Sequence, residues 1–553
     1  MSEYSGEDAN FISSKYEREY NYNLNVSQRF ENRKENEKLF ERIDFREDQK
    51  KKAYTYDSQN RLTHFVNISG NTTRLFYDKN DKIIKQVFPE QYNETEDNGV
   101  GTTYSYNLKG QVIEVKNALD ETVTKNTYDP KGNLKTSIDG ENNKVEYTYT
   151  LLGQIKDIVT PNSRKENKEA QSYKYDARGN ITGITDGNGN ETSYLLDDWG
   201  RIIQITTPEG GVEKYTYDYA GNITSTTDAN GGTIEYFYNS LGQVCEIRDQ
   251  EGNSEYFYYD SEGNLTKHID RNQNHVDRRY NLDRNIVSVK AYQIDEKAVA
   301  LEAKKAEEAK KKEEERTSNS SLDQIPRRRS FTERMKEKRE RQKLEEQIHE
   351  IIEDLDKYKL NIVNQSFNYN PDGTLNNAYT GNMRYNYTYN KEGILKSKSA
   401  SGRTLISYTY NKNNNIKSIK DITGKSSIYS YDDANRVKLI QDDKENIVAS
   451  YDYYCNDNIK SVTVGNGLKT DYTYDGDGNV QSLVTVTSTG EVLVDYNYAY
   501  DLNGNRLQKV SSKHKNFYTY DSMNRVKDSN YDDRCESFTY DKVGNRLQKQ
   551  QTI

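Results

Sequence analysis

The chain has 553 residues, of which only 32% are hydrophobic and 30% are charged, and its formal net charge is −9. This composition excludes an ordinary set of domains with dense aliphatic cores, since average soluble domains are roughly 45–50% apolar. It also disfavours plain disorder, because the chain has 48 tyrosines and aromatic residues are scarce in disordered chains.

Three further classes are disfavoured by the bulk sequence. The acidic balance argues against a nucleic-acid partner, and the three widely separated cysteines, Cys245, Cys455 and Cys535, do not suggest a disulfide framework. No stretch approaches the roughly 20 apolar residues that span a bilayer. The start, MSEYSGEDAN, lacks the basic and apolar regions of a secretory signal. We therefore expect a soluble chain without membrane insertion, whose localisation stays open.

Residues 1–50 form a polar segment ahead of the first repeat. Phe30, Leu39, Phe40 and Ile43 have the spacing of a short amphipathic helix. Such a helix would cap the first repeat, and the alternative is a loose segment. The sequence does not decide between the two.

A tandem repeat occupies 51–290 and resumes over 363–553. Its marker is the second aromatic residue of a tyrosine pair, and from 175 to 280 the marker recurs every 21 residues. Eleven units precede a long gap and nine follow it. The markers are Tyr56, Tyr77, Tyr106, Tyr128, Tyr149, Tyr175, Leu196, Tyr217, Tyr238, Tyr259, Tyr280, Tyr369, Tyr389, Tyr410, Tyr431, Tyr453, Tyr474, Tyr500, Tyr520 and Tyr540.

Each unit contains two turns and two short strands. In 215–238 the turns are YAGN (219–222) and DANGG (228–232), whose glycine and asparagine supply the positive φ of tight hairpins. Between them, 223–227 and 233–238 are rich in β-branched and aromatic residues, which predicts strands. One unit is therefore a β-hairpin, and successive units should continue as a meander.

The tyrosine pair fixes which face of the strand is aromatic. Tyr215 and Tyr217 are two residues apart, so both rings leave the strand on one side while Thr216 points to the other. Neighbouring units should then form tyrosine ladders. The positions that we assign to the repeat motif are Tyr54, Tyr56, Asp57, Tyr173, Tyr175, Asp176, Gly179, Tyr215, Tyr217, Asp218, Gly221, Tyr408, Tyr410, Tyr472, Tyr474, Asp475, Gly478, Tyr498, Tyr500, Asp501, Tyr518, Tyr520 and Asp521.

No unit can bury its aromatic face alone, so stability must come from stacking of units. About forty strands cannot stay flat, and their twist should coil the sheet into a spiral or a closed wall. With so few aliphatic residues, the enclosed space should be lined by tyrosine and polar groups. The predicted fold class is thus mainly β, with tandem hairpins in a coiled sheet or partial hollow shell.

The interruption at 291–362 has a different composition. AVALEAKKAEEAKKKEEER (298–316) consists of strong helix formers, and a second helix is expected from near Ser330, with Leu344, Ile348 and Ile352 on one stripe. A projecting helical hairpin with solvated charges is the simplest interpretation. Alternatives are a docking arm for a partner and, from the basic run 327–343, contact with an acidic surface.

No catalytic or metal motif stands out. DGNGN (186–190) and DGDGN (475–479) imitate calcium loops but lack the glycine and glutamate of an EF-hand at the required positions, so we interpret them as turns. The five histidines have no zinc spacing, and no nucleophile elbow or phosphate loop is present. Because the motif is iterated whereas an active site needs one unique constellation, we expect no enzyme activity and no cofactor.

The unit Y-x-Y-D-x-x-G-N/R-L resembles the YD repeat of the Rhs protein family. It occurs as YTYDSQNRL (54–62), YKYDARGNI (173–181), YTYDGDGNV (472–480) and YAYDLNGNRL (498–507). The family includes Rhs polymorphic toxins, the B and C components of toxin complexes, bacterial wall-associated proteins and teneurins. The resemblance implies a β-strip wound into a shell, with non-catalytic repeats, that in the toxins encloses an effector.

The end of the sequence departs from the toxin pattern. FTYDKVGNRL (538–547) is followed only by QKQQTI, without the DPxG-type segment and effector of the toxins, and the DPKG at 129–132 lies in an ordinary repeat turn. The expected function is a non-catalytic shell or scaffold in an Rhs-type toxin or interbacterial competition system. Its partner would be a separately encoded effector or second shell component. The alternative is a cell-surface protein that binds carbohydrate.

Overall fold

A computed structural model describes residues 42–45, 51–67, 70–294 and 359–552. They belong to two compact units, Met1–Thr103 and Tyr104–Ile553. The elements of the first unit are β1 (Arg42–Phe45), β2 (Lys51–Tyr56), β3 (Leu62–Val66), β4 (Thr72–Tyr77), β5 (Ile83–Val87), the 3-10 turn η2 (Pro89–Gln91), β6 (Tyr92–Asn93) and β7 (Asn98–Gly99), and β8 (Thr102–Tyr106) begins in it.

The second unit consists of two runs of hairpins, which we call the first arm (104–294) and the second arm (359–552). The first arm contains β9 (Val112–Lys116), β10 (Thr122–Tyr128), β11 (Leu134–Asp139), β12 (Lys144–Tyr149), β13 (Ile155–Val159), α2 (Pro161–Lys165), β14 (Gln171–Tyr175), β15 (Ile181–Asp186), β16 (Glu191–Leu196), β17 (Ile202–Thr206), β18 (Val212–Tyr217), β19 (Ile223–Thr227), β20 (Thr233–Tyr238), β21 (Val244–Arg248), β22 (Ser254–Tyr259), β23 (Leu265–Ile269), β24 (His275–Tyr280) and β25 (Ile286–Ile294).

The second arm contains β26 (Lys359–Tyr369), β27 (Leu375–Thr380), β28 (Met383–Tyr389), β29 (Leu395–Ala400), β30 (Arg403–Tyr410), β31 (Ile416–Asp421), β32 (Ser426–Tyr431), β33 (Val437–Gln441), β34 (Ile447–Tyr453), β35 (Ile459–Val464), β36 (Lys469–Tyr474), β37 (Val480–Val486), β38 (Val492–Tyr500), β39 (Arg506–Val510), β40 (Lys515–Tyr520), β41 (Val526–Asn530), β42 (Cys535–Tyr540) and β43 (Arg546–Thr552).

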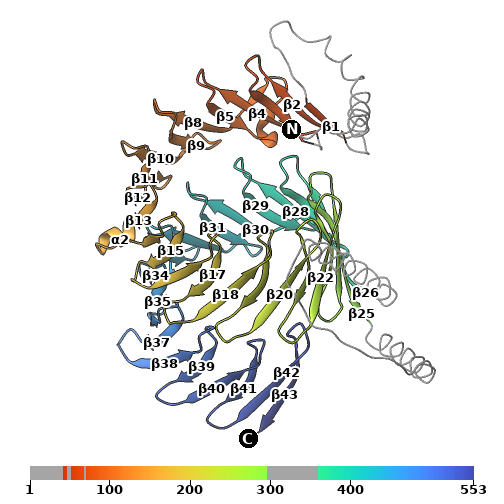
Figure 1. The fold of residues 1–553 in the computed structure, drawn as a ribbon. Coiled ribbons are helices and arrows are strands. Elements are labelled where there is room, and N and C mark those ends of the chain that lie inside the picture. Colours follow the sequence, from red (N-terminus) through yellow and green to blue (C-terminus); the bar gives the residue numbers. More distant parts are fainter. Residues whose placement is uncertain (1–41, 46–50, 68–69, 295–358, 553) are drawn as a thin grey trace, which may run out of the picture. The chain divides into compact units, whose positions relative to one another are not determined.

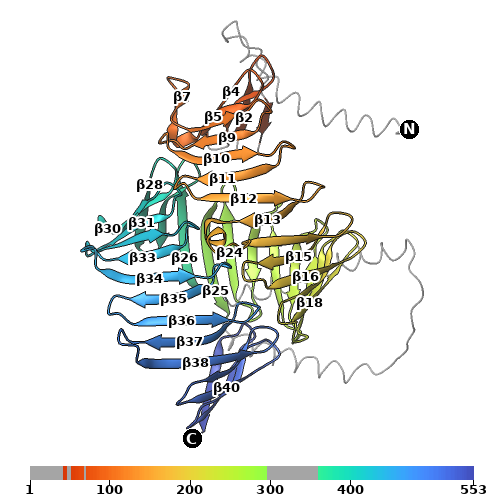
Figure 2. The same ribbon diagram turned by 90° about the vertical axis from the view of Figure 1, so that its left-hand side faces the viewer.

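Each strand from β9 to β43 pairs antiparallel with the next strand along the chain, so the second unit is one continuous meander of hairpins (Figures 1 and 2). The two strands predicted within 215–238 are β19 (Ile223–Thr227) and β20 (Thr233–Tyr238). The prediction of a mainly β fold made of tandem hairpins is confirmed.

Each repeat has a turn after its marker tyrosine, which we call the YD turn, and a second turn that we call the return turn. In the YD turn of 176–180, the amide of Asp176 donates to the carbonyl of Asn180, and the amide of Gly179 donates to the carbonyl of Asp176. The fourth turn residue has positive φ, as Gly221 (91°) and Asn60 (62°) show, which explains the preference for glycine and asparagine there.

The aspartate of the motif holds this turn closed. Asp176 Oδ1 accepts the amides of Arg178 and Asn180, and Asp176 Oδ2 accepts the Asn180 side chain at 3.0 Å. An aspartate at the first turn position can bond its own backbone two residues on, which is why this residue type favours turns. In this motif the asparagine or arginine four residues later adds a side-chain donor, as Arg61 does for Asp57 at 2.7 Å.

A β-bulge accompanies every marker residue except Tyr106, for which no strand register is defined. In the β18–β19 pair, Thr216 lies opposite Ser225 but Tyr217 lies opposite Ile223, so Thr224 is an extra residue. A bulge interrupts the ladder and increases the local twist. The marker tyrosine of the next repeat then bonds a carbonyl beside the bulge, as the hydroxyl of Tyr238 does to Ile223 at 2.7 Å.

This tyrosine-to-carbonyl bond occurs in the first unit and recurs along both arms of the second. It joins Tyr77, Tyr128, Tyr149, Tyr175, Tyr217, Tyr238, Tyr259, Tyr280, Tyr369, Tyr389, Tyr410, Tyr431, Tyr453, Tyr474, Tyr500, Tyr520 and Tyr540 to the strand that precedes each of them. Consecutive repeats are therefore linked by a side chain as well as by the backbone ladder.

The sheet is a single layer with little packed core. The tyrosine pair lies half-buried on one face, with the rings of Tyr408 and Tyr410 stacked at 6.4 Å between centroids. The threonine between them is exposed on the other face, where Thr409 bonds Ser418. The core cluster is Ile269 with Tyr256 and Tyr258 packed against it. Stability rests on stacked neighbours, as the composition requires.

The structure differs from expectation at two boundaries. Ile43, assigned to a short helix, lies in β1, which pairs with the edge of β2. An unpaired strand edge offers free backbone donors and acceptors, and this pairing outweighs the helical spacing. Around the interruption, Ile294 pairs with Lys359, so strand pairing extends into both ends of 291–362. The predicted helical hairpin and the rest of 1–50 lie outside the described residues.

The stretched steps of the repeat have local causes. Between Tyr77 and Tyr106 the chain adds η2 and the two-stranded pair β6–β7, and between Tyr149 and Tyr175 it adds α2. Thr160 caps α2 by accepting the Ser163 amide, and Pro161 occupies the first helical position. Insertions in return turns thus leave the ladder intact.

The tyrosine-to-carbonyl bond can be tested by removing one hydroxyl. Tyr410→Phe should lower the local opening free energy of β29 and β30 by about 1 kcal/mol, since the Leu395 carbonyl loses its donor. Tyr408→Phe is the matched control, because the Tyr408 hydroxyl makes no hydrogen bond within the described part of the chain, and its effect should stay below about 0.5 kcal/mol. Hydrogen exchange of the two strands measures both, and equal losses would contradict the role.

Candidate functional site: the seam between the two arms

The return turns of the first arm contact the YD turns of the second arm along a line that we call the seam. Most of its hydrogen bonds join residues 267 to 274 apart in sequence. The near-constant separation follows from the common repeat length of the two arms. The contacting segments pair as 117–121 with 390–393, 139–143 with 411–415, 160–165 with 432–433, 186–190 with 454–458, 207–211 with 475–478, 228–232 with 501–505, 249–253 with 521–525, and 270–274 with 541–545.

Asp139 shows how the seam is held. Its Oδ1 accepts the amides of Glu141 and Asn143 within its own return turn. Its Oδ2 accepts the side-chain amides of Asn413 at 2.7 Å and Asn435 at 2.8 Å from the second arm, together with that of Asn143 at 3.0 Å. One carboxylate therefore closes its own turn and joins two repeats of the other arm.

The same chemistry recurs at later positions. Asp186 accepts the side-chain amide of Asn456 at 2.9 Å, and Asp228 accepts that of Asn524 at 2.9 Å. The opposite direction also occurs, with Asn230 donating to Asp501 and Asn272 donating to Asp541, both at 2.8 Å. The seam is thus an aspartate–asparagine network in which charge-assisted hydrogen bonds replace apolar contact.

Close approach of the backbones explains one glycine. A Cβ atom placed on Gly187 would lie 2.7 Å from the Cys455 carbonyl oxygen and 2.8 Å from Cys455 Cβ. Only glycine leaves room for the YD turn of 454–458 there. The DGNGN segment at 186–190, interpreted from sequence as a turn, is a return turn that abuts the second arm.

Hydrogen bonding sets the ionisation of the seam carboxylates. Burial opposes ionisation of Asp139, but the hydrogen bonds from Asn435 and Asn143 outweigh it and hold the pKa below the ordinary 3.8. The pKa of Asp186 is lowered in the same way against burial by Asn456 and Asn190. Glu392, which accepts the Ala118 amide, differs because burial raises the pKa of its carboxyl.

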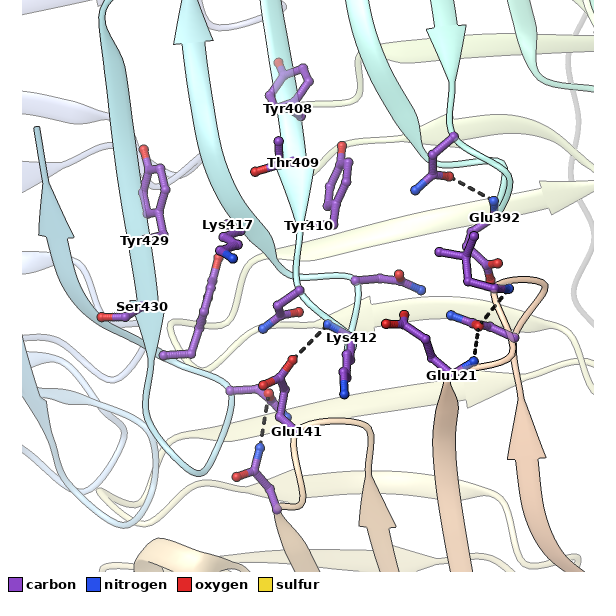
Figure 3. Close-up of a pocket in the computed structure, with 18 of the residues that line it drawn as sticks. Glu121, Glu141, Glu392, Tyr408, Thr409, Tyr410, Lys412, Lys417, Tyr429 and Ser430 are labelled. Atoms are coloured by element: carbon purple, nitrogen blue, oxygen red, sulfur yellow. Dashed lines mark hydrogen bonds between the residues drawn. The ribbon is translucent and has the colours of Figure 1, made fainter. Parts of the chain in front are cut away.

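A cleft of about 720 Å³ opens at the seam. Figure 3 shows Tyr408 and Tyr410 on β30 and Tyr429 on β32 beside Lys417, with Glu121 and Glu141 reaching in from the first arm. Glu141 and Lys412 meet at its edge, where the Lys412 amide donates to Glu141 Oε1 at 2.8 Å. The cleft therefore combines aromatic rings with amide and charged groups.

A second cleft of about 710 Å³ lies further along the seam, between 184–228 of the first arm and 456–524 of the second. It is lined mostly by turn residues, including Asp186, Asp477, Asn503 and Asn524. Within the described residues, no group of three or more His, Cys, Asp and Glu side chains is arranged to hold a metal ion. Nor does the described part contain a helix with the length and apolar character to cross a membrane.

The motif residues predicted from sequence are spread along the sheet rather than gathered in one place. Tyr408 and Tyr410 reach the first cleft, Gly478 lines the second, and Asp501 accepts Asn230 across the seam at 2.8 Å. The tyrosine pairs at 54–56, 173–175, 215–217, 472–474, 498–500 and 518–520 lie in β2, β14, β18, β36, β38 and β40. The motif aspartates close their own YD turns, some of them together with the glycine three residues later. They are Asp57, Asp176 with Gly179, Asp218 with Gly221, Asp475 and Asp521.

Sequence reasoning missed the return-turn aspartates Asp139, Asp186 and Asp228 as joining residues. Their local signal is the ordinary turn signal that many aspartates share. Only their partners in the second arm distinguish them, and nothing in a single sequence marks which repeats meet.

The chain was compared with known proteins. The RHS repeat family model matches residues 175–212, 197–233 and 217–254. No curated protein sequence matches the chain. Among solved structures, TcdB2-TccC3 is similar with a TM-score of 0.50 and 12% identity, over 93% of this chain and 34% of that chain.

Two further solved structures are similar at lower scores. TcdB2-TccC3-Cdc42 gives a TM-score of 0.32 at 13% identity, over 93% of this chain and 30% of that chain. A Photorhabdus luminescens Tc holotoxin pore with a mutated TccC3 gives 0.33 at 12% identity, over 92% and 30%. The chain thus spans about a third of the length of the solved chains, and at these identities the likeness concerns the fold.

Substituting one seam aspartate should open the seam locally. In Asp139→Asn a single side-chain oxygen cannot accept both the turn amides and the three side-chain donors that meet at Oδ2. An unsatisfied buried group costs about 1–3 kcal/mol, so exchange of amides in 139–143 and 411–415 should be on the order of tenfold faster.

Asp176→Asn is the matched control for that test. Asp176 closes its own turn with the same bonds but has no partner from the second arm among the described residues. Its substitution should leave exchange at 411–415 unchanged. Equal acceleration by both variants, measured by hydrogen–deuterium exchange mass spectrometry, would show that the seam does not depend on Asp139.

Acid should weaken the seam. Because the folded pKa values of Asp139, Asp186 and Asp228 lie below 3.8, their stabilisation is present above pH 3.8 and is lost as the pH falls further through the folded values. The protection factors of the seam turns, corrected for the intrinsic pH dependence of amide exchange, should therefore fall below pH 3.8, and the fall should be smaller in Asp139→Asn. A seam equally protected at pH 3 and pH 6 would contradict this.

Proposed function

We propose that this chain, which matches the RHS repeat model over 175–254 and whose single-layer sheet is joined to itself along a seam, is a non-catalytic structural wall of a toxin-complex-type assembly. In this role it holds or presents an effector polypeptide that another chain supplies. The observation that carries the proposal is the seam, since a strip whose edges bond to each other encloses space instead of packing against a second layer.

The solved relatives support the same role. The solved structure TcdB2-TccC3, which is similar in fold, contains more than one named component. The present chain has about a third of the length of those chains. We accordingly propose a partial wall that a second shell component completes.

The free turns of the first arm support the need for a further component. Five of its nine YD turns carry apolar tips that are largely exposed, whereas the YD turns at 176–180 and 260–264 carry none. Exposed apolar groups on one side of a protein are typical of interaction surfaces. The tips are Leu108, Leu151, Leu152, Trp199, Tyr219 and Leu241, with exposures between 76% and 108%.

A second candidate function is carbohydrate binding. The first cleft brings the rings of Tyr408, Tyr410 and Tyr429 beside Lys417 and Glu121, and pockets with aromatic faces and a few polar groups suit sugars as well as peptides. Titration with soluble cell-wall oligosaccharides distinguishes this function, which requires saturable binding that Tyr408→Ala and Tyr429→Ala abolish.

The wall function can be tested with an unfolded polypeptide as a surrogate effector. Fluorescently labelled, reduced and carboxymethylated α-lactalbumin should bind the full chain and be digested by protease at least about threefold more slowly when bound. Tyr408→Ala with Tyr429→Ala should weaken this retention, since their rings face the cleft. Thr473→Ala, which has the same place in another Y-T-Y motif, bonds Ser482 and does not line the cleft, is the control and should not.

Two results would overturn the wall proposal. One is an absence of saturable binding of the unfolded polypeptide, and the other is retention that the cleft variants leave untouched. Anisotropy of the label and the protease time course are both read on the full chain, so the outcome does not depend on a catalytic assay.

A further inference from the structure

The β-bulges of the second arm carry a row of lysines. At four consecutive marker tyrosines, from Tyr389 to Tyr453, the extra residue that the bulge adds to the following strand is a lysine. The run ends in the next two repeats, where the extra residues are Gln481 and Leu507. We call the four residues the lysine row, and they are Lys396, Lys417, Lys438 and Lys460.

The bulge places the extra side chain on the face opposite the tyrosine pairs, which we call the threonine face. In the β18–β19 pair, the hydroxyl of the extra residue Thr224 lies 2.8 Å from that of Thr216, the residue between the two tyrosines. The register is the same at all four lysines, so they share this face. Because neighbouring strands lie about 4.8 Å apart, the lysines recur about every 10 Å and the row spans about 30 Å.

The lysines of the row have no paired acid. All four are exposed, and none forms an ion pair with another residue that the structure describes. The Lys460 ammonium lies 5.6 Å from the ring centre of Tyr454. Like charges about 10 Å apart repel one another, since this distance is close to the screening length at physiological salt. An anionic partner that spans the row would relieve this repulsion.

The acids of the threonine face are already engaged. Between β29 and β36 the strand positions of this face carry Asp452 and Asp471. Asp452 accepts the Ser461 hydroxyl at 3.0 Å, and Asp471 pairs with Lys469 at 2.7 Å. The face is therefore basic, although the whole chain is acidic.

Hydroxyl groups lie beside the lysines. The hydroxyls of Thr388 and Ser397, next to Lys396, are hydrogen-bonded at 2.7 Å, and those of Thr409 and Ser418, next to Lys417, at 2.7 Å. In such a pair one proton lies between the two oxygens, and the other hydroxyl keeps its proton to donate elsewhere. The row thus offers ammonium and hydroxyl donors side by side, which suits an anion rich in oxygen acceptors.

The residue types select among anions. The lysine ammonium is a compact point charge that binds phosphate, whereas the planar fork of arginine matches carboxylates, and the row contains lysine alone. Single-stranded nucleic acid requires aromatic rings on which its bases stack. The aromatic residues of the described strands β29–β35 all belong to tyrosine pairs on the other face: Tyr408, Tyr410, Tyr429, Tyr431, Tyr451 and Tyr453.

We infer that the lysine row binds a linear phosphodiester polymer without bases, namely a polyol phosphate chain that lies across strands β29–β35. The ammonium groups pair with phosphates along the chain, and the neighbouring hydroxyls donate to phosphate oxygens. The inference goes beyond the proposed wall function, because it assigns a partner to the threonine face. Lys396 and Lys417 also line the first cleft, whereas Lys438 and Lys460 lie outside it.

The first test measures binding of poly(ribitol phosphate), a wall teichoic acid freed from peptidoglycan, to the full chain by biolayer interferometry. Saturable binding is expected at low salt. Because the contacts are ionic and exposed, binding should weaken at least about fivefold when NaCl is raised from about 50 to about 300 mM.

Variants with equal loss of charge locate the site. Replacing all four lysines of the row by glutamine should weaken binding at least about tenfold, since each exposed ionic contact contributes a fraction of the total. The control replaces four exposed turn lysines by glutamine and should stay within about twofold of the parent. It combines Lys425→Gln, Lys444→Gln, Lys513→Gln and Lys542→Gln.

Footprinting on the unchanged chain gives a readout that needs no variant. The bound polymer should slow acetylation of the row lysines by N-hydroxysulfosuccinimide acetate at least about threefold, because exposed ionic contacts that hold the ammonium groups compete with the reagent. Lys425 and Lys513 should react at an unchanged rate. Mass spectrometry of the digested chain resolves the individual lysines.

Three results would overturn the inference. They are an absence of saturable binding, equal loss of binding in the row variant and its control, and acetylation of the row that the polymer does not slow. Binding of mixed-sequence single-stranded DNA, heparin or polyglutamate as tight as that of poly(ribitol phosphate) would refute the phosphodiester class and indicate a general anion surface.

The double variant Lys438→Gln with Lys460→Gln separates this inference from the wall function. Both residues lie outside the first cleft, so polymer binding should weaken at least about threefold while retention of unfolded α-lactalbumin persists. Failure of retention with polymer binding intact would refute the wall function and leave the lysine row as a binding surface. Polymer binding that this variant leaves unchanged would contradict the row.

Discussion

One tyrosine hydroxyl per repeat, bonded to a carbonyl of the preceding repeat, is the interaction on which the rest of this sheet depends. The YD turn is followed by a bulge that takes one residue out of the ladder, and the next tyrosine, such as Tyr238, bonds the Ile223 carbonyl there. The bulge supplies twist, and the tyrosine compensates for its cost in hydrogen bonding. Repetition then produces a regularly twisted strip that has almost no aliphatic core.

The seam follows from that regularity. Since both arms repeat with nearly the same step, a single match between a return turn and a YD turn places the following turns in register as well. Asp139, Asp186 and Asp228 use one oxygen for their own turn and the other for an asparagine of the second arm. The aspartates that close the return turns thus also form the hydrogen bonds between the two arms.

The local structure could be predicted from the sequence because the residues that determine the turns and strands of a repeat lie within that repeat. The strands at 223–227 and 233–238, and the shared face of Tyr408 and Tyr410, follow from patterns within a few residues. The partner of Asp139 could not be predicted, because Asn413 lies 274 residues away and no local pattern selects one repeat among twenty. The place of Ile43 in a strand could not be predicted either, because its helical spacing carries no information on the strand edge with which it pairs.

The repeats of this sheet contact one another in two independent directions. Along the ladder, each Y-x-Y strand completes the one before it, as β40 does for β39 through the Tyr520 hydroxyl and the Arg506 carbonyl. Across the ladder, polar turns join one arm to the other. Since neither direction needs an apolar core, repeats can follow one another while the tyrosine face stays half-buried. In the proposed function, such a surface would retain a polypeptide through many weak aromatic and polar contacts without competing for its hydrophobic residues.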